Sequence, residues 1–131
     1  MRTLHITVIL TIAVVVLLTA CSTAATPAAQ PTAAPVTIKF ATKPEIAQAG
    51  DVELIFRVLD STGQPLSGAD VDVIADHTEM GGMIMHGKAT EQSTGLYSIK
   101  ANFSMAGKWK VTVQVQKDSL DYKQDIDLQV R

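Results

Sequence analysis

Hydrophobic and polar residues alternate along most of the chain after residue 35. Every second residue between positions 52 and 58 is large and apolar, and the same pattern returns between positions 109 and 115. Successive side chains of a β-strand point to opposite faces of a sheet, so this period of two predicts strands with one buried face. The predicted inward residues of six strands are Val36, Ile38 and Phe40; Val52, Leu54, Phe56 and Val58; Val71, Val73 and Ala75; Tyr97, Ile99, Ala101 and Phe103; Trp109, Val111, Val113 and Val115; and Tyr122, Ile126, Leu128 and Val130.

Residues that favour turns separate these strands. A short strand at about residues 83–90 brings the predicted number to about seven, and no part of the folded region shows the period of an amphipathic helix. Strands with one hydrophobic face are typical of antiparallel sheets whose outer side is solvated. The sequence therefore predicts an all-β fold, an immunoglobulin-like antiparallel sandwich. The turns are expected at residues 49–51, 61–65, 81–82, 94–95, 106–107 and 118–119.

The first 21 residues have the pattern of an export signal. Arg2 precedes an apolar run of 13 residues, Ile6–Leu18, which is shorter than the ~20 residues that span a bilayer. The run ends in Leu18-Thr19-Ala20-Cys21, which resembles a bacterial lipobox. This resemblance implies that residues 1–20 are a lipoprotein signal peptide and that Cys21 carries a lipid. An ordinary secretory signal and a short anchor helix are the alternatives.

The segment that follows contains little that could form a core. Residues 21–35 are rich in alanine, proline and threonine and have no charged side chain, so we predict an extended tether. Residues 36–131 are then the folded domain. Together these segments predict a protein exported and held by its lipid on the extracytoplasmic face of a bacterial membrane, close to membrane-bound partners.

Charge and motifs exclude several classes of function. Arg2 is the one charged residue before position 22, so the rest of the chain has 10 Lys and Arg against 13 Asp and Glu. A net charge of −3 without a basic patch argues against nucleic acid as a partner. No nucleophile elbow or cofactor-binding glycine loop occurs, so we do not expect an enzyme.

Soft metal ligands cluster in one short segment. Three methionines lie within six residues in the run His77-Thr78-Glu79-Met80-Gly81-Gly82-Met83-Ile84-Met85-His86, and the histidines at its ends are the only two after residue 5. A further methionine, Met105, lies in the predicted turn at residues 103–107. Thioether sulfur and imidazole suit copper, and Cu(I) in particular, with Cu(II) as the other oxidation state. Because Cys21 is the single cysteine, the folded domain has no thiolate to offer.

The predicted topology gathers most of these residues. In an antiparallel sandwich alternate connections lie at the same end, so Met80, Met83 and Met105 are expected at one pole, with His77 close by. Met83 and Met85 share one face of their strand, and His86 lies on the other face. We therefore expect three or four ligands, drawn from the six candidates His77, Met80, Met83, Met85, His86 and Met105.

Three segments in this order resemble a known family. They are Met80-Gly81-Gly82-Met83-Ile84-Met85-His86-Gly87, Gly95-Leu96-Tyr97 and Phe103-Ser104-Met105-Ala106-Gly107-Lys108-Trp109. Their methionine-rich stretch, GxY strand start and MxGxW turn are similar to those of YtkA-like domains, which are akin to the FixH family, over about residues 71–116. The resemblance implies a small exported sandwich domain, and several members are linked to copper handling or cytochrome oxidase assembly. FixH-like proteins usually carry a transmembrane helix, whereas this chain has a lipobox.

The prediction for function is a membrane-tethered copper-binding module that carries, buffers or delivers copper to a membrane-bound copper enzyme or transporter. The main alternative is a metal-free structural or interaction lipoprotein whose methionine-rich pole docks a membrane complex, since methionine commonly fills gaps in cores and contact surfaces. A sacrificial sink for oxidants is a third interpretation. His77 could also be a turn histidine bonded to Asp76 or Glu79, and these carboxylates with His77 and His86 could form a zinc site.

Overall fold

Antiparallel β-strands account for most of the residues that the structure describes. The computed structural model describes residues 35–131, so the predicted signal peptide, the lipidated Cys21 and nearly all of the tether lie outside the described residues. The alternating pattern is confirmed, because inward positions of β2 and β6 are buried throughout. The strands are β1 (Val36–Lys43), β2 (Gly50–Asp60), β3 (Asp70–His77), β4 (Ile84–Ser93), β5 (Leu96–Phe103), β6 (Gly107–Lys117) and β7 (Leu120–Val130).

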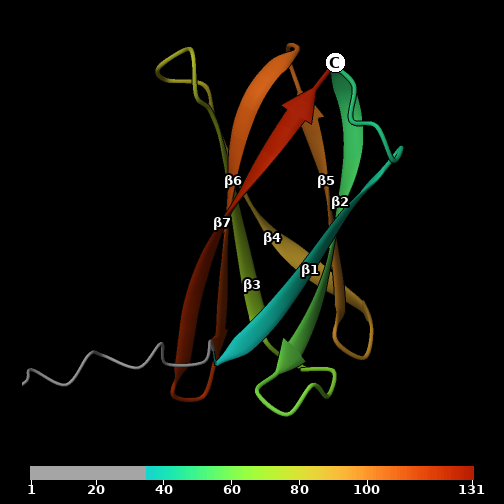
Figure 1. Cartoon of the computed structure of the whole chain (residues 1–131), viewed down its shortest axis with the longest axis vertical. Coiled ribbons are helices and arrows are strands. Elements are labelled where there is room, and N and C mark those ends of the chain that lie inside the picture. The colour runs from blue at the N-terminus through green and yellow to red at the C-terminus, as the bar shows by residue number, and fades with distance from the viewer. Residues whose placement is uncertain (1–34) are drawn as a thin grey trace, which may run out of the picture. The chain divides into compact units, whose positions relative to one another are not determined.

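The strands form two layers that β4 joins. Their hydrogen-bonded order is β1-β2-β5-β4-β3-β6-β7, and every pair is antiparallel. The first part of β4 pairs with β3 through residues 84–89, and its last part pairs with β5 through residues 90–93. In Figure 1, β4 accordingly runs obliquely between the two layers. Four strands in the order 1-2-5-4 facing strands 3, 6 and 7 are the immunoglobulin arrangement, which confirms the predicted fold class.

The core lies between the two layers. Its largest fully buried side chains include Trp109, Tyr97, Phe56 and Phe103, as the alternation predicts. All of its buried residues lie between positions 36 and 130, and residues 33–131 form one compact unit. These residues can therefore be studied as a separate domain. Residues 35–131 contain no helix, and hence none that is long and apolar enough to cross a membrane.

The connections between strands lie alternately at the two ends of the sandwich. The β1–β2, β3–β4 and β5–β6 connections lie at one end together with the C-terminal residue Arg131 (Figure 1). Backbone hydrogen bonds tie Arg131 to Ala47 and Ala49 of the β1–β2 connection. Because residues 78–83 and 104–106 contain Met80, Met83 and Met105, we call this end the methionine pole. The opposite end, with residues 61–69, 94–95 and 118–119, is the far pole.

Candidate metal centre at the methionine pole

His77 is the last residue of β3, where it enters the methionine pole. Its side chain is only 4% exposed, so it faces the interior. On one side it lies opposite Trp109 of β6 in the sheet register. On the other side its backbone N–H donates to the carbonyl of Met83 over 3.1 Å, which continues the β3–β4 ladder beyond its last register pair. Met83, which directly precedes β4, is therefore the neighbour of His77 on β3, and His77 is the neighbour of Trp109 on β6, in one row.

Both ring nitrogens of His77 face backbone groups. Nδ1 accepts a hydrogen bond from the backbone N–H of Glu79 over 3.3 Å. Nε2 lies 3.5 Å from the carbonyl oxygen of Ala106, in the β5–β6 connection. An acceptor at Nδ1 and a carbonyl facing Nε2 define the neutral tautomer with its proton on Nε2. One alternative from the sequence was that His77 is bonded to Glu79. The structure contains this bond, and the group of Glu79 that makes it is the backbone N–H.

Met105 is held close to the same aromatic cluster. The indole N–H of Trp109 donates to the carbonyl of Met105 over 3.3 Å. The Trp109 ring also meets the rings of His77 and Phe103 edge-on, with centroids 5.0 Å away in each case. The side chains of Met83 and Met105 are partly buried against the core. Both residues therefore pack at the edge of the core, and their backbone carbonyls are bonded to His77 and Trp109.

Met80 is the exposed member of the set. Its backbone N–H donates to the carbonyl of His77 over 3.4 Å, which closes the first turn of the β3–β4 connection. Its side chain is 48% exposed, although methionine is a hydrophobic residue. The pole thus has one exposed methionine, Met80, and two partly buried ones, Met83 and Met105.

Met85 and His86 lie away from this group. Met85 is opposite Ala75 and packs partly buried against the core one inward row below Met83, whereas His86 is opposite Ile74 on the exposed outer face. The predicted separation of the two residues by face is confirmed. Both line a lateral cleft of about 200 Å³, where β4 diverges from β5. Of the six candidate ligands, the structure brings four to the methionine pole: His77, Met80, Met83 and Met105.

The structure argues against the zinc alternative. Among residues 35–131, no three side chains of His, Cys, Asp or Glu come together in a group that could hold a metal ion. Asp76 is opposite Ile84, which is 62% exposed, so it belongs to the outer face, while His77 is buried. The hard ligands needed for zinc are thus dispersed over the two faces of the sheet.

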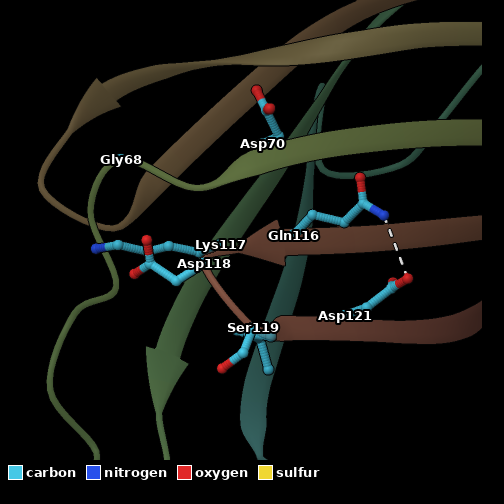
Figure 2. Close-up of a pocket in the computed structure, with 8 residues that line it drawn as sticks. Gly68, Asp70, Gln116, Lys117, Asp118, Ser119 and Asp121 are labelled. Atoms are coloured by element: carbon cyan, nitrogen blue, oxygen red, sulfur yellow. Dashed lines mark hydrogen bonds between the residues drawn. The ribbon is translucent and has the colours of Figure 1, made fainter.

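The far pole holds a polar hollow with a different character. It has a volume of about 550 Å³ and is lined by residues including Asp70, Lys117, Asp118 and Asp121 (Figure 2). Asp121 accepts hydrogen bonds from the side-chain amides of Gln114 and Gln116 over 2.8 and 3.2 Å. These bonds stabilise the ionised carboxylate and lower the pKa of Asp121 below its usual value. This carboxylate therefore serves the local structure of the β6–β7 hairpin.

Sequence reasoning did not identify two contributors to the methionine pole. One is the backbone N–H of Glu79, for which no sequence signal exists. The other is Gly107, which the sequence indicated only as a turn residue. A Cβ atom at position 107 would overlap Nε2 of His77, and the backbone there has φ +141°. The imidazole of His77 therefore occupies the space that a side chain at position 107 would need.

The fold and this pole define a class of protein: an immunoglobulin-like β-sandwich with a methionine-rich end. A profile of the YtkA-like family matches residues 31–114, well over half of the chain, and the chain therefore belongs to the YtkA-like family. This finding confirms the resemblance seen in the sequence. No curated protein matches the chain.

Proposed function

We propose that the protein is an exported, lipid-anchored module that binds copper at the methionine pole and carries, buffers or delivers it near a membrane. The observation that carries this proposal is that the two connections with Met80, Met83 and Met105, far apart in sequence, lie at the same end of the sandwich (Figure 1). Copper is cargo in this proposal. Its expected recipient is a membrane-bound copper enzyme or transporter.

The chemistry of the pole fits Cu(I) best. Thioethers are soft, neutral ligands that select Cu(I) over harder divalent ions. The carboxylate of Asp76 and the imidazole of His86 belong to residues on the outer face, away from the inward row that contains Met83. The chain has one cysteine, Cys21, so a thiolate is not a competing ligand within the folded domain. We therefore assign the ion to the thioethers of Met80, Met83 and Met105.

A second candidate function needs no metal. Met83, Met85 and Met105 pack against the core, as structural methionines do. Met80 and Ile84 expose 48% and 62% of their surface near the same end, which suits a contact surface for a protein partner. In this alternative the methionine pole docks a membrane complex, and a chelator would not affect that interaction.

Titration with Cu(I) separates the two functions. The domain of residues 33–131 is titrated anaerobically against a chromophoric Cu(I) chelator. We expect competition with an endpoint of one copper per chain. Replacing Met80 and Met83 together by leucine removes two thioethers while keeping apolar bulk, and should weaken binding at least tenfold, or about 1.4 kcal/mol.

Met85→Leu is the matched control for this titration. It makes the same chemical change one row deeper in the sheet, opposite Ala75. We expect less than about a threefold change in affinity, because Met85 is outside the assigned ligand set. Failure of the domain to compete for copper, or equal affinity of the wild-type and Met80/Met83 variants, would overturn the copper assignment in favour of the docking function.

The lipid anchor has its own test, because it concerns residues outside the described structure. In a bacterial host that processes lipoproteins, the full chain should partition with membranes and incorporate a labelled fatty acid. Cys21→Ser should abolish the labelling, since the thiol is the acceptor. Labelling that persists in the variant would contradict lipidation at Cys21.

A further inference from the structure

His77 connects the two segments that contain the methionines of the pole. Through its backbone it bonds to Met80 and Met83 in the β3–β4 connection. Through its ring it contacts the backbone N–H of Glu79 in the same connection and the carbonyl of Ala106 in the β5–β6 connection. A single buried residue therefore touches the backbone of both methionine-bearing connections.

The ring has no free lone pair in this arrangement. In the neutral tautomer defined above, Nδ1 uses its lone pair to accept the Glu79 N–H, and Nε2 carries the proton. To bind a metal at Nδ1, the ring would have to give up its bond to Glu79. To bind through Nε2, it would have to lose the proton that faces Ala106. Either change breaks a contact of a side chain that is 4% exposed, and unpaired polar groups in such places are costly.

The packing around the ring fixes it in this position. Trp109 meets one edge at a centroid distance of 5.0 Å and an interplanar angle of 80°. Gly107 lies against Nε2 so closely that a Cβ atom there would overlap it. The ring is therefore held between β6 and the β5–β6 connection, and cannot swing outward without leaving a void in the interior.

We propose that His77 is a positioning residue of the methionine pole and not a metal ligand, so that the copper ion is bound by thioethers alone. This inference rests on the copper-binding function proposed above. Residues that contact and orient the ligands, without touching the metal ion themselves, commonly control metal affinity as strongly as some ligands do. Keeping the imidazole away from the ion also preserves a ligand set that favours Cu(I), because imidazole would add affinity for zinc and Cu(II).

Two spectroscopic measurements on the domain of residues 33–131 test whether His77 binds the ion. Long-range ¹H–¹⁵N correlation spectra report the tautomer of each histidine, and we expect His77 to show the proton on Nε2 before and after Cu(I) is added. X-ray absorption of the copper-loaded domain should show sulfur neighbours only. A nitrogen neighbour that disappears in His77→Gln, or loss of the Nε2 proton on loading, would overturn the proposal.

Substitutions at His77 test positioning without relying on copper. His77→Phe keeps a ring against Trp109 but removes both polar contacts, whereas His77→Gln retains a donor that can reach Ala106. In the metal-free domain, the methyl resonances of Met83 and Met105 should shift strongly in His77→Phe and little in His77→Gln. With copper, affinity should fall at least tenfold in His77→Phe and less than about threefold in His77→Gln. Unchanged methyl resonances in His77→Phe would contradict a positioning role.

Gly107→Ala provides a second route to the same conclusion. The added methyl group displaces the His77 ring without substituting any methionine, so methyl shifts at Met83 and Met105 and a tenfold loss of Cu(I) affinity are expected. Gly63→Ala is the matched control, because Gly63 also has positive φ, at +82°, but a Cβ there meets no atom within 4 Å. If the two substitutions changed the methionine resonances equally, backbone strain alone would explain the changes. That outcome would contradict the proposal.

The outcomes distinguish this inference from the proposed function. Absence of Cu(I) binding together with the expected methyl shifts would overturn the copper function and leave His77 as an organiser of the pole. Copper binding with a nitrogen ligand from His77 would support the function and overturn the inference.

Discussion

His77 and Trp109 lie directly opposite each other on β3 and β6, and their rings meet edge-on at a centroid distance of 5.0 Å. The indole N–H of Trp109 is bonded to the carbonyl of Met105. Trp109 is the single tryptophan of the chain, so the tryptophan fluorescence of the protein originates beside the candidate metal centre.

This relationship predicts an intrinsic signal for metal binding. Anaerobic addition of Cu(I) to the domain should change the Trp109 emission in proportion to occupancy and reach a plateau at one equivalent, because the bound ion alters the surroundings of the indole. The control is the variant with both Met83 and Met105 replaced by leucine, in which the change should be absent. An identical response in that variant, or one without a plateau, would show that the signal comes from elsewhere.

Tyr97 predicts a stability contribution at the far pole. Its hydroxyl donates to the carbonyl of Leu66 over 2.8 Å and accepts from the N–H of Ala69 over 3.0 Å, so β5 holds the β2–β3 connection. Tyr97→Phe should lower the free energy of unfolding by about 1–3 kcal/mol, because it leaves two backbone groups without a partner. Urea denaturation at neutral pH measures this, and Tyr122→Phe, at a half-exposed tyrosine, serves as the comparison.

The same tyrosine predicts a loss of stability in alkaline solution. Burial raises the pKa of Tyr97 above its ordinary value of 10.0. The unfolded chain therefore loses this proton at lower pH than the folded protein. The contribution of Tyr97 to the free energy of unfolding is present below pH 10. It is lost as the pH rises through the pKa of Tyr97 in the folded protein. The free energy of unfolding, measured from about pH 8 to about pH 11, should fall less steeply in Tyr97→Phe than in the wild type. Parallel curves would contradict this assignment.

The hydrogen bonds of Glu91 predict that the free energy of unfolding falls as the pH is lowered. The Ser67 hydroxyl and the backbone N–H groups of Gly68 and Gly95 hold the pKa of Glu91 below its ordinary value of 4.5. Its stabilisation is present above pH 4.5 and is lost as pH falls through the lowered pKa. Glu91→Gln should therefore be less stable than the wild type at neutral pH, with a difference that shrinks in acid. A difference that stays constant as the pH falls would contradict this assignment.

Gly87 and Ile99 predict a measurable coupling across the lateral cleft. A Cβ atom at position 87 would lie 2.5 Å from Cδ1 of Ile99. Gly87→Ala should destabilise the domain by about 1 kcal/mol, because the isoleucine must shift. Ile99→Val removes Cδ1, so the same glycine substitution should cost less in that background. A double-mutant cycle of denaturation measurements gives the coupling, and additive effects would exclude the contact.

Much of the fold could be predicted from the sequence because strand periodicity is a local property. Buried positions such as Val52, Phe56 and Val113 follow directly from the alternation of apolar and polar residues. The alternation also predicted that Met85 and His86 point to opposite faces, and counting antiparallel strands was enough to place Met80 and Met105 at one pole. None of these inferences required knowledge of which strands pair.

The differences between equivalent-looking residues could not be predicted in the same way. His77 and His86 both flank the methionine cluster, yet one is buried beside Trp109 and the other lies exposed next to Ile74. Whether each histidine is buried or exposed depends on how β4 pairs with β3 and on where β4 diverges from β5. Strand pairing of this kind is set by contacts between segments far apart in sequence. The partners of the His77 ring, the Glu79 N–H and the Ala106 carbonyl, are backbone groups that every residue has.

The sequence alone determined the seven strands, their inward faces and the set of soft ligands, because these depend on residue type and on a period of two. Tertiary structure decided that His77 lies within the core, that Gly107 gives it space, and that Met83 and Met105 flank an aromatic cluster while Met85 lies deeper. Such choices depend on strand pairing and close packing in three dimensions, where a ring can fit only if its neighbours leave room for it.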